Sequence, residues 1–588
     1  MRIIHCAWAA ALLSALAAGS CAKDTTGNGG TGTTESYNDK IDSYLAERYL
    51  WNSEYGQMTR DLTIEYAADN DNFLTRTLLG MTSNTLDKKR YTNGTGQNYY
   101  KLYSYITRKA RSRAATGPKT RGVNHGVRKE TEYGFGFARL GVVRFSNTGK
   151  AGFYVMAVYP GSPADRAGFR RGTIFSEIDG AEIADSESEY TPVYKRLTSP
   201  SGAASVLFKV RETGEETTLT AERLYPNPVL RAEVIEEGEH KIGYMVYNGF
   251  DAAYDDDLLD SLRKFRDAGI TDLVFDLRYN GGGHVISAKM LATCIAGEKC
   301  DGKVFQYYRY NDSRMADPAK TQKQTGNTYD REKALFYENF SYGDYYGADL
   351  KQYALGLQNI YVLTTGSTAS SSEAVINGLR GIDIGVTLIG EKTNGKNVGM
   401  EIDKFDDGDY SYELAPITFE GYNAKKETVN PAGLAVNYAV ADWNNRLVDF
   451  GPEEPMLAKA LSLITGRTYT PAPGRSAAGI ADSGCLAAGR RAKTRRHARP
   501  LPAARGVVPG RRRRIRCTSY RRPAGRPALP PQGGETAPFP NKRTEEAQKL
   551  PLTVLKIWRI KIYTLYLHTR NPKFGGKAQV VKLVDTLL

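Results

Sequence analysis

Two short segments of this chain carry residues that could act together as a nucleophile and a base. The first holds three consecutive serines, Ser370 to Ser372, followed by Glu373. The second is a glycine-flanked loop that ends at Lys396. A serine hydroxyl needs a base to become a nucleophile, and a lysine amine taken out of water can be that base. The pair therefore predicts a serine hydrolase of the Ser-Lys kind.

The serine segment also has a purely structural explanation. Ser370 and Glu373 have the spacing of a capping box, which stabilises the start of a helix without any catalysis. The sequence predicts a buried strand at 359–364, then a tight turn, then a helix at 370–380. This order puts the serine at a helix N-terminus, where free N–H groups and the helix dipole favour negative charge.

A second bend with chemical potential is glycine-rich and lies between a predicted strand at 271–277 and a predicted helix at 284–296. It consists of Asn280 and the three glycines that follow it. Such a bend can point backbone N–H groups at an oxyanion, although an ordinary strand-to-helix turn has the same composition. His284 comes directly after the glycines and would be the base of a competing Ser-His-Asp mechanism. We favour the interpretation that His284 starts the helix.

The elements that must position these bends belong to residues 235–465, where predicted buried strands alternate with helices. This alternation indicates an α/β core. The predicted strands are 241–247, 271–277, 359–364 and 385–389, and the predicted helices are 255–268, 284–296 and 370–380. Residues 301–350 are rich in tyrosine and are expected to be less regular.

Residues 133–230 have a different character, with short strands predicted at 153–158 and 174–178 among glycine-rich turns. This stretch resembles a PDZ domain. The residues that match the carboxylate-binding loop of that family are Gly134, Phe135, Gly136 and Phe137. In such a loop, free backbone N–H groups receive the terminal carboxylate of a peptide that adds to the sheet as a strand.

Together the bends and the domain order resemble the carboxyl-terminal processing peptidases, also called tail-specific proteases, over roughly residues 133–461. The resemblance implies a multi-domain chain with a helical N-terminal region, a β-rich PDZ domain and an α/β peptidase core of the crotonase/ClpP-like kind. It implies Ser370 as the nucleophile and Lys396, rather than Lys392, as the general base.

The same resemblance implies two backbone oxyanion donors, the N–H groups of Ser371 and Gly283, with Gly282 as a weaker choice for the second. The sequence departs from the family pattern at two positions. Ser371 replaces an alanine, and Met400 stands where many members carry a glutamine thought to orient the lysine amine. Since methionine accepts no strong hydrogen bond, the amine needs another partner or the activity is lower.

A lysine base also has a physical requirement. The ordinary pKa of a lysine amine is about 10.4, so burial must lower the pKa before the amine can accept a proton at neutral pH. The implied mechanism is acyl transfer, and it requires neither a metal nor another cofactor. In agreement with this expectation, no spacing of cysteines and histidines in the sequence indicates a zinc site.

The length and the charge of the chain indicate its class and its domain organisation. The chain has 588 residues, which predicts several domains, and a formal net charge of +15. The charge is unevenly spread: residues 475–588 hold 26 Lys+Arg and 5 Asp+Glu, which leaves 54 and 60 in residues 1–474. The body is thus mildly acidic, and we expect no nucleic-acid binding. The basic tail is expected to be disordered. It is either an electrostatic arm or, as we favour, a non-native extension.

The N-terminal residues 1–20 are predicted to be a targeting segment. Their apolar run is too short to span a bilayer, and it ends before Cys21. The pattern resembles a bacterial lipoprotein signal with lipidation at Cys21, although Ala18 stands where a leucine is usual. Simple secretion is the alternative. In either case the mature chain is expected to leave the cytoplasm. The expected location is the bacterial cell envelope, and lipidation would tie the chain to a membrane through the flexible tether at 21–36.

Between the tether and the PDZ-like stretch lie a predicted helical region at 37–115 and a linker at 116–132. Helices are expected at 39–49 and 61–79 from the spacing of their apolar residues. Further along, Cys294 and Cys300 are six residues apart. They could close a small disulfide loop or remain two free thiols, and the sequence leaves both open.

The leading hypothesis is a serine endopeptidase that cleaves proteins near their C-termini, with PDZ recognition of the substrate terminus. Its partners would be proteins or peptides with a free C-terminus. One alternative is a catalytically silent protein that binds peptides through the PDZ domain and the groove of the same scaffold. A further alternative is a hydrolase of non-peptide acyl compounds on the same core.

Overall fold

The computed structural model describes residues 37–92, 97–110, 133–145, 148–343, 345–443 and 447–469, together with the two-residue strand β1 (Ile3–Ile4). Cys21, the tether, the linker at 116–132 and the tail at 475–588 lie outside the described residues. Among the residues described, no helix has the length and apolar character needed to cross a membrane.

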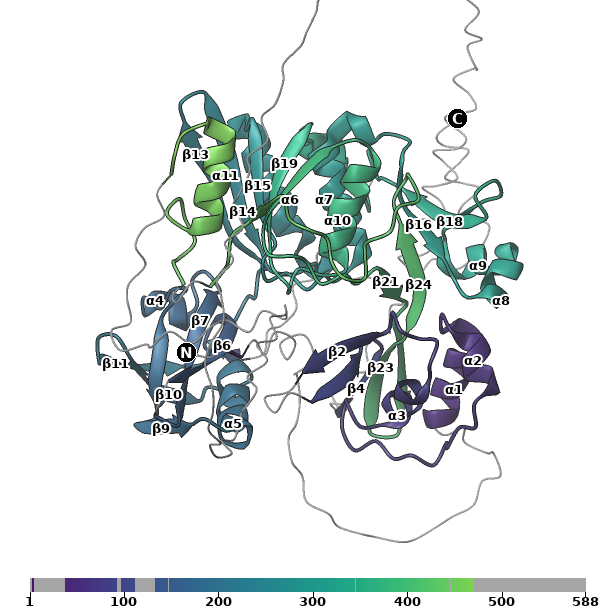
Figure 1. The fold of residues 1–588 in the computed structure, drawn as a ribbon, viewed down its shortest axis with the longest axis horizontal. Coiled ribbons are helices and arrows are strands. Elements are labelled where there is room, and N and C mark those ends of the chain that lie inside the picture. Colours follow the sequence, from purple (N-terminus) through teal and green to yellow (C-terminus); the bar gives the residue numbers. More distant parts are fainter. Residues whose placement is uncertain are drawn as a thin grey trace, which may run out of the picture. The chain divides into compact units, whose positions relative to one another are not determined.

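A six-stranded sheet forms the core of the region that carries the predicted site (Figure 1). Its strands, in spatial order, are β13 (Val229–Glu237), β14 (His240–Tyr247), β15 (Asp272–Asp276), β19 (Asn359–Thr364), β20 (Gly385–Gly390) and β25 (Tyr438–Ala439). β13 is antiparallel to β14, and the remaining neighbours are parallel. The strands predicted from apolar runs in this region are confirmed.

Helices cover both faces of this sheet. α6 (Asp255–Ala268), α7 (Val285–Ala296) and α10 (Ser371–Gly381) pack against one face, and α11 (Pro455–Thr465) packs against the other. Strand β14 shows the period of two that this requires, because Met245 faces the first group of helices and Tyr244 faces α11. The α/β core is therefore confirmed, and α6 has the predicted bounds.

The tyrosine-rich stretch at 301–350 is more regular than predicted. It contains β16 (Val304–Arg309), α8 (Asp312–Ala316), α9 (Pro318–Thr325), β17 (Thr328–Asp330) and β18 (Leu335–Asn339). These strands join β24 (Ile417–Tyr422) and β21 (Val398–Met400) in a five-stranded sheet of order β17-β18-β16-β24-β21. The expectation of irregular structure is wrong because β16 obtains its partner from a strand far along the chain.

The N-terminal region is helical only in its first half. It contains α1 (Tyr37–Arg48), α2 (Asn52–Gln57) and α3 (Phe73–Gly80), followed by β2 (Lys88–Thr92), β3 (Asn98–Leu102) and β4 (Tyr105–Ala110). The helix predicted at 61–79 is wrong before residue 73. There the Asn38 side chain of α1 donates to the carbonyls of Leu62 and Ile64, at 2.7 and 2.9 Å, and takes the place of helical hydrogen bonds.

This N-terminal region packs against the strands that follow the lysine loop. β4 pairs with β23 (Tyr410–Ala415), which also pairs with β22 (Asp403–Asp407). A buried apolar cluster joins Ile41 and Phe73 of the N-terminal helices to Val398 and Leu414. The hairpin β2–β3 and strand β4 therefore lie beside the segment that begins at the predicted base (Figure 1).

Residues 133–223 form a β-rich unit with two helices. Its strands and helices are β5 (Tyr133–Gly134), β6 (Phe137–Phe145), β7 (Lys150–Val158), α4 (Pro163–Arg166), β8 (Ile174–Ile178), β9 (Ala181–Ala184), α5 (Glu187–Thr198), β10 (Ser205–Val210), β11 (Glu216–Thr220) and β12 (Glu222–Arg223). The main sheet has the order β1-β6-β7-β9-β8-β10-β11. Phe153, Phe175 and Phe208 are fully buried in its core.

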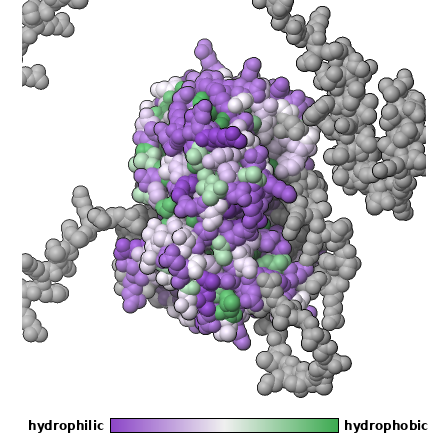
Figure 2. All heavy atoms as spheres, turned by 90° about the vertical axis from the view of Figure 1, so that its right-hand side faces the viewer, coloured by the Kyte–Doolittle hydropathy of each residue, from purple (hydrophilic) through white to green (hydrophobic). Residues whose placement is uncertain are grey.

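The face of the molecule drawn in Figure 2 is predominantly hydrophilic, with hydrophobic residues in small, separate groups. Single exposed apolar residues are normal on soluble domains and need no partner to explain them.

Candidate active site

The three bends singled out in the sequence meet at one edge of the core sheet. β15, β19 and β20 are neighbours and parallel, so their carboxyl ends lie at the same edge. Ligand sites of α/β sheets form at such edges. The bend after β15 carries the three glycines, the bend after β19 carries Ser370, and the loop after β20 carries Lys396.

Hydrogen bonds connect the three bends directly. The Thr368 hydroxyl donates to the carbonyl of Leu277 at 2.7 Å, and the Ala369 N–H donates to the carbonyl of Asn280 at 3.1 Å. On the other side, the Asn394 N–H donates to the carbonyl of Thr368 at 2.9 Å. The serine bend is thus fixed between the glycine bend and the lysine loop.

Ser370 has a strained backbone. Its φ is +57° and its ψ is −115°, a region that side chains other than glycine rarely occupy. Such a conformation costs on the order of 1–3 kcal/mol and persists where the surrounding structure enforces it, often at functional sites. The strain sits at the one serine that the sequence predicted as the nucleophile.

The hydroxyl groups of the three serines differ in their environment. The Ser371 hydroxyl donates to the carbonyl of Gly283 at 2.7 Å, and the Ser372 hydroxyl donates to the carbonyl of Asn280 at 3.0 Å. Both of these side chains are buried. The Ser370 side chain is partly exposed. Its oxygen accepts the backbone N–H of Glu373 in the capping box, and its hydroxyl proton has no acceptor among the described residues. Ser370 is therefore the serine that is available for reaction.

Glu373 connects the serine bend to the lysine loop. Its carboxylate is fully buried and accepts from the Ser370 N–H at 3.0 Å, which is the glutamate half of the predicted capping box. It also accepts from the Thr393 hydroxyl at 2.6 Å and from the N–H groups of Gly395 and Lys396 at 2.7 and 2.9 Å. Burial raises the pKa of Glu373, while these four donors favour its charged form.

Lys396 and Lys392 lie in different environments. Lys392 is exposed, whereas Lys396 is half-buried, and burial lowers the pKa of its amine to about 8. The charges of Asp87 and Glu373 act in the opposite direction and favour the ammonium form of Lys396. Lys396 thus has the lowered pKa that a lysine base requires, and this favours it over Lys392.

The predicted pair is linked through backbone N–H groups rather than through side chains. One oxygen of Glu373 accepts from the backbone N–H groups of both Ser370 and Lys396. Within the described part of the chain, no hydrogen bond joins the Ser370 hydroxyl to the Lys396 amine. In sites without substrate, catalytic hydrogen bonds are often long and tighten when substrate binds.

Gly282 and Gly283 were the two candidates for the second oxyanion donor, and their backbone N–H groups differ in the structure. The Gly282 N–H donates to the Asn280 side chain at 2.9 Å, so it is already used. The N–H groups of Gly283 and Ser371 have no acceptor among the residues that the structure describes. Gly282 has φ +103°, and a Cβ there would lie 2.8 Å from the Ser370 Cβ and 2.9 Å from the Ser371 nitrogen. The geometry therefore favours Gly283 over Gly282 as the second oxyanion donor.

His284 is placed as a helix-start residue. It directly precedes α7, and its Nδ1 accepts from the N–H of Ala252 at 3.0 Å. Its Nδ1 also lies 3.9 Å from a carboxylate oxygen of Asp251. The His284 Nδ1 is therefore occupied by the backbone of Ala252, which disfavours the alternative Ser-His-Asp mechanism.

Comparison with known proteins identifies the region that holds these bends. Residues 241–437 match the sequence profile of Peptidase family S41. This segment is an S41 peptidase domain. The chain is 32% identical over 154 residues to carboxyl-terminal-processing peptidase 2, chloroplastic, of Arabidopsis thaliana, which corresponds to 24% of this chain and 28% of that protein. The chain thus matches less than a third of the length of that relative.

A solved structure supports the fold of the S41 domain and its surroundings. A crystal structure from Bacteroides fragilis NCTC 9343, assigned to the S41 proteases, aligns with a TM-score of 0.51 and 23% identity. The alignment covers 73% of this chain and 98% of that chain. At this identity the likeness establishes the fold alone.

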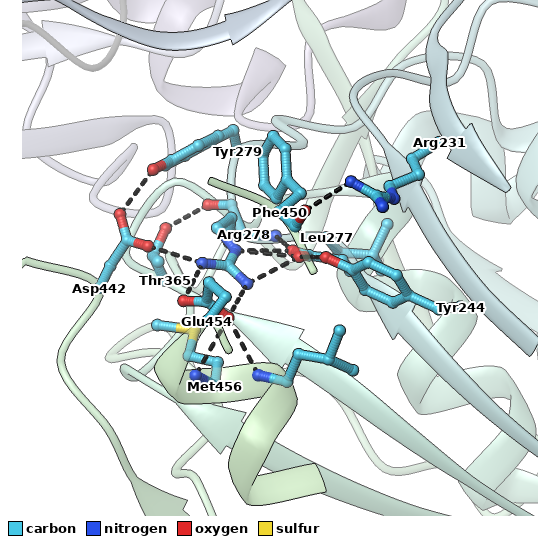
Figure 3. Close-up of polar contacts among 12 residues, drawn as sticks. Arg231, Tyr244, Leu277, Arg278, Tyr279, Thr365, Asp442, Phe450, Glu454 and Met456 are labelled. Atoms are coloured by element: carbon cyan, nitrogen blue, oxygen red, sulfur yellow. Dashed lines mark hydrogen bonds and ion pairs between the residues drawn. The ribbon is translucent and has the colours of Figure 1, made fainter. Parts of the chain in front are cut away.

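Shortly before the glycine bend in the sequence, the S41 domain has a buried ion cluster centred on Arg278 (Figure 3). The Arg278 guanidinium donates to Asp276 at 2.8 Å, to Asp442 at 3.0 Å and to Glu454 at 2.6 Å. Burial alone would raise the pKa of Asp442, but Arg171 and Arg278 beside it hold the pKa below its ordinary value. The cluster ties the end of β15 to the segment that leads into α11.

The β-rich unit at 133–223 reaches the same cluster through two arginines. Arg171 donates to Asp442 at 2.6 Å and to the Tyr279 hydroxyl at 3.1 Å. Arg139 donates to the carbonyl of Tyr279 at 2.9 Å and to the Ser367 hydroxyl at 3.3 Å. Tyr279 directly precedes the glycine bend, so these contacts support the bend.

Sequence reasoning missed several residues that shape the site. Asp276 and Arg278 are two apart at a strand end, which is a local signal for a paired buried charge. No local signal exists for Asp442, for Glu454 or for Tyr103, whose ring lies 5.1 Å from the Lys396 amine. These residues approach the site only through tertiary folding.

The two cysteines of the S41 domain are buried free thiols in the structure. Burial raises the pKa of both Cys294 and Cys300, which keeps them in the unreactive thiol form. The sequence left open whether Cys294 and Cys300 form a disulfide or remain free thiols, and in the structure they are free thiols. Within the described ranges, no group of three or more His, Cys, Asp or Glu side chains is placed to hold a metal ion.

Proposed function

We propose that this protein is a serine endopeptidase that cleaves proteins near their C-termini with Ser370 as nucleophile and Lys396 as general base. One observation carries the proposal. The strained Ser370, whose hydroxyl proton has no acceptor among the described residues, shares the Glu373 carboxylate with a lysine whose amine has a pKa of about 8. A stabilising helix cap alone would require neither the strain nor the half-buried lysine.

The proposed reaction is acyl transfer. The Ser370 Oγ attacks the carbonyl carbon of the scissile peptide bond while its proton passes to the Lys396 Nζ. The carbonyl oxygen becomes an oxyanion and accepts from the N–H groups of Ser371 and Gly283. The C–N bond then breaks as the Lys396 ammonium returns the proton to the leaving amine. Water hydrolyses the resulting ester, again with the Lys396 amine as base, and restores the Ser370 hydroxyl.

We propose that residues 133–230 act as a PDZ domain that receives the substrate C-terminus. The N–H groups of Phe135 and Gly136 donate to no acceptor in the described part of the chain, which supports a carboxylate-binding loop there. Gly136 has φ +98°, and a Cβ at this position would collide with Ser162. β6 follows the loop, and on its outer side the two-residue strand β1 pairs with it. That pairing supports an edge to which a peptide can add.

The side chains of this loop have separate structural roles in the proposal. Phe135 is fully buried, and the Phe137 ring contacts Phe169, Phe175 and Phe208. Both rings therefore anchor the loop to the core of the unit. The backbone N–H groups, rather than the aromatic rings, would contact the peptide carboxylate.

We further propose a lipid-anchored location in the bacterial cell envelope. The leader sequence and Cys21 carry this proposal, since they have the order of a lipoprotein signal. Labelling of cells with a radioactive fatty acid should mark the full chain. The Cys21→Ser variant should lose the label, while retained label in that variant would refute anchoring at this residue.

The serine mechanism is tested with a fluorophosphonate probe that acylates activated serines. The wild-type chain should be labelled at Ser370, as located by peptide mass spectrometry. Ser370→Ala and Lys396→Ala should not be labelled, whereas the control Lys392→Ala should react like the wild type because Lys392 is exposed. A wild-type chain that folds but is never labelled would instead support the silent peptide-binding alternative.

Recognition of the terminus is tested with paired peptides that differ only in a free or amidated C-terminus. The proposal expects faster cleavage of the peptide with the free carboxylate. Equal cleavage of both would remove the PDZ part of the proposal while leaving the serine mechanism intact. Turnover of a small ester but of neither peptide would favour the hydrolase of non-peptide acyl compounds.

A further inference from the structure

The Lys396 amine faces an aromatic ring rather than a hydrogen-bond acceptor. Its Nζ lies 5.1 Å from the centroid of the Tyr103 ring. Among the described residues, the amine has no hydrogen-bond acceptor. Met400, which occupies the position of an orienting glutamine in the family resemblance, packs instead against the N-terminal apolar cluster. The ring is therefore the group that contacts the base.

Tyr103 is fixed from both ends. Its backbone N–H donates to the side chain and to the carbonyl of Asp87, at 3.0 and 2.8 Å. Its hydroxyl donates to the Asn394 side chain at 2.6 Å, two residues before the base. Lys89 of strand β2 donates to the Asn394 carbonyl at 2.7 Å, so the hairpin and the lysine loop are linked twice. The ring consequently cannot turn away without breaking these contacts.

The two carboxylates near Lys396 are already occupied. Asp87 is fully buried and accepts from the Tyr49 and Ser104 hydroxyls at 2.7 and 2.6 Å, in addition to its backbone donors. Glu373 accepts from its four donors. Both favour the charged amine from a distance and neither contacts it, whereas burial opposes the charge. The π face of Tyr103 is therefore the group that directly contacts the Lys396 ammonium and can stabilise it.

We propose that Tyr103 is the positioning residue of the base, and that its ring holds the ammonium form of Lys396 that exists after the proton of Ser370 has been transferred. A cation is attracted to the face of an aromatic ring, and the attraction grows in a site from which water is excluded. The ring therefore stabilises the charged product of proton transfer more than the neutral amine that precedes it, as catalysis requires. The inference rests on the proposed function above.

A consequence is that the N-terminal region belongs to the active site. Tyr103 lies between β3 and β4, and the Asp87 that anchors it directly precedes β2. The peptidase domain at 241–437 alone contains the nucleophile, the base and the oxyanion donors but not this contact. The proposal thus assigns a chemical role to residues 37–110 that the domain boundaries do not suggest.

The test compares Tyr103→Leu, Tyr103→Phe and the control Tyr100→Leu, which removes an exposed ring from strand β3, three residues before Tyr103. The readout is the pH profile of kcat/KM on the cleaved peptide. Tyr103→Leu should lower the plateau by roughly 10- to 30-fold and move the rising limb about one pH unit lower, because the ammonium loses its stabilising contact. Tyr103→Phe should keep the limb, and Tyr100→Leu should match the wild type.

A second readout separates this inference from the proposed function. In the Ser370→Ala background, which has no activity, the pKa of Lys396 is followed by the pH dependence of its 13Cε NMR signal. Addition of Tyr103→Leu should lower that pKa. If Tyr103→Leu does not fold, Tyr103→Met fills similar space without a π face and carries the same expectation.

The outcomes are distinguishable. A wild-type chain that cleaves peptides, combined with an unmoved pH limb and an unmoved Lys396 pKa in the Tyr103 variants, would overturn the inference alone. A wild-type chain that is never labelled or active, combined with a shifted Lys396 pKa, would overturn the proposed function while the tyrosine–lysine contact stands.

Discussion

The carboxylate of Glu373 accepts the backbone N–H of Lys396 at 2.9 Å, although the two residues belong to different elements. The same oxygen accepts the N–H of Ser370 at 3.0 Å. The proposed nucleophile and the proposed base are therefore both held, through their backbone N–H groups, by one carboxylate oxygen. Their relative position depends on a buried carboxylate more than on any contact between their own side chains.

Glu373→Gln should separate the two functional residues. The amide group presents N–H donors to a site lined by four donors, so at least one buried N–H would lose its acceptor. We expect a loss of about 1–3 kcal/mol in the free energy of unfolding, measured by urea denaturation. Probe labelling of Ser370 should slow at least tenfold. The control Glu332→Gln, at a side chain that is 88% exposed, should change neither quantity.

Activity should rise with pH because the base must be deprotonated. The amine of Lys396 has a pKa of about 8, so kcat/KM should increase through that pH and level off above it. The profile is measured as the rate of cleavage of a peptide substrate between about pH 6 and pH 10. Over most of this range a lysine with the ordinary pKa of about 10.4 stays protonated. A flat profile across this range would contradict lysine as the base.

Gly282→Ala should abolish activity while Gly281→Ala is tolerated. A Cβ at Gly282 would lie 2.8 Å from the Ser370 Cβ and the Ala369 carbonyl, so the nucleophile would have to move. The same atom at Gly281 would meet nothing within 4 Å. Loss of an oxyanion donor alone costs about 100- to 1,000-fold in kcat, so we expect at least that for Gly282→Ala. Similar kcat values for the two variants would contradict this placement of the bend.

Arg278→Met should destabilise the S41 domain strongly. The substitution leaves Asp276, Asp442 and Glu454 buried without their shared cation. Removing one partner of a buried ion pair typically costs about 3–5 kcal/mol. The control Arg309→Met removes an exposed pair with Asp312, which is worth about 1 kcal/mol or less. Comparable urea midpoints for the two variants would show that the cluster adds little.

The local sequence pattern was sufficient to predict an element whose own residues determine its periodicity and its end. α6 was predictable because Leu258, Leu262 and Phe265 follow the helical period and Gly269 ends the helix with φ +66°. Ser370 and Lys396 were predictable as candidates because short motifs carry them. The order of the parallel strands then explains why the motifs meet.

The remaining features depend on partners that are distant in the sequence. Residues 61–72 contain apolar residues at helical spacing but form turns, since Asn38 satisfies their carbonyls. The strands at 304–309 and 335–339 were not predicted because the aromatic cluster that stabilises them includes Phe419. Likewise, nothing near Lys396 in the sequence indicates that a tyrosine would cover its amine.

The contact between Tyr103 and Asn394 joins residues 291 positions apart. A ribosome adds Tyr103 long before it adds Asn394, so the nascent chain first contains the tyrosine without the lysine loop that its hydroxyl and ring contact. The ribosome must synthesise the lysine loop, and the strand at 410–415 that pairs with β4, before the Lys396 amine can pack against the Tyr103 ring. The contact between the Tyr103 ring and the Lys396 amine can therefore form only after most of the described residues have been synthesised.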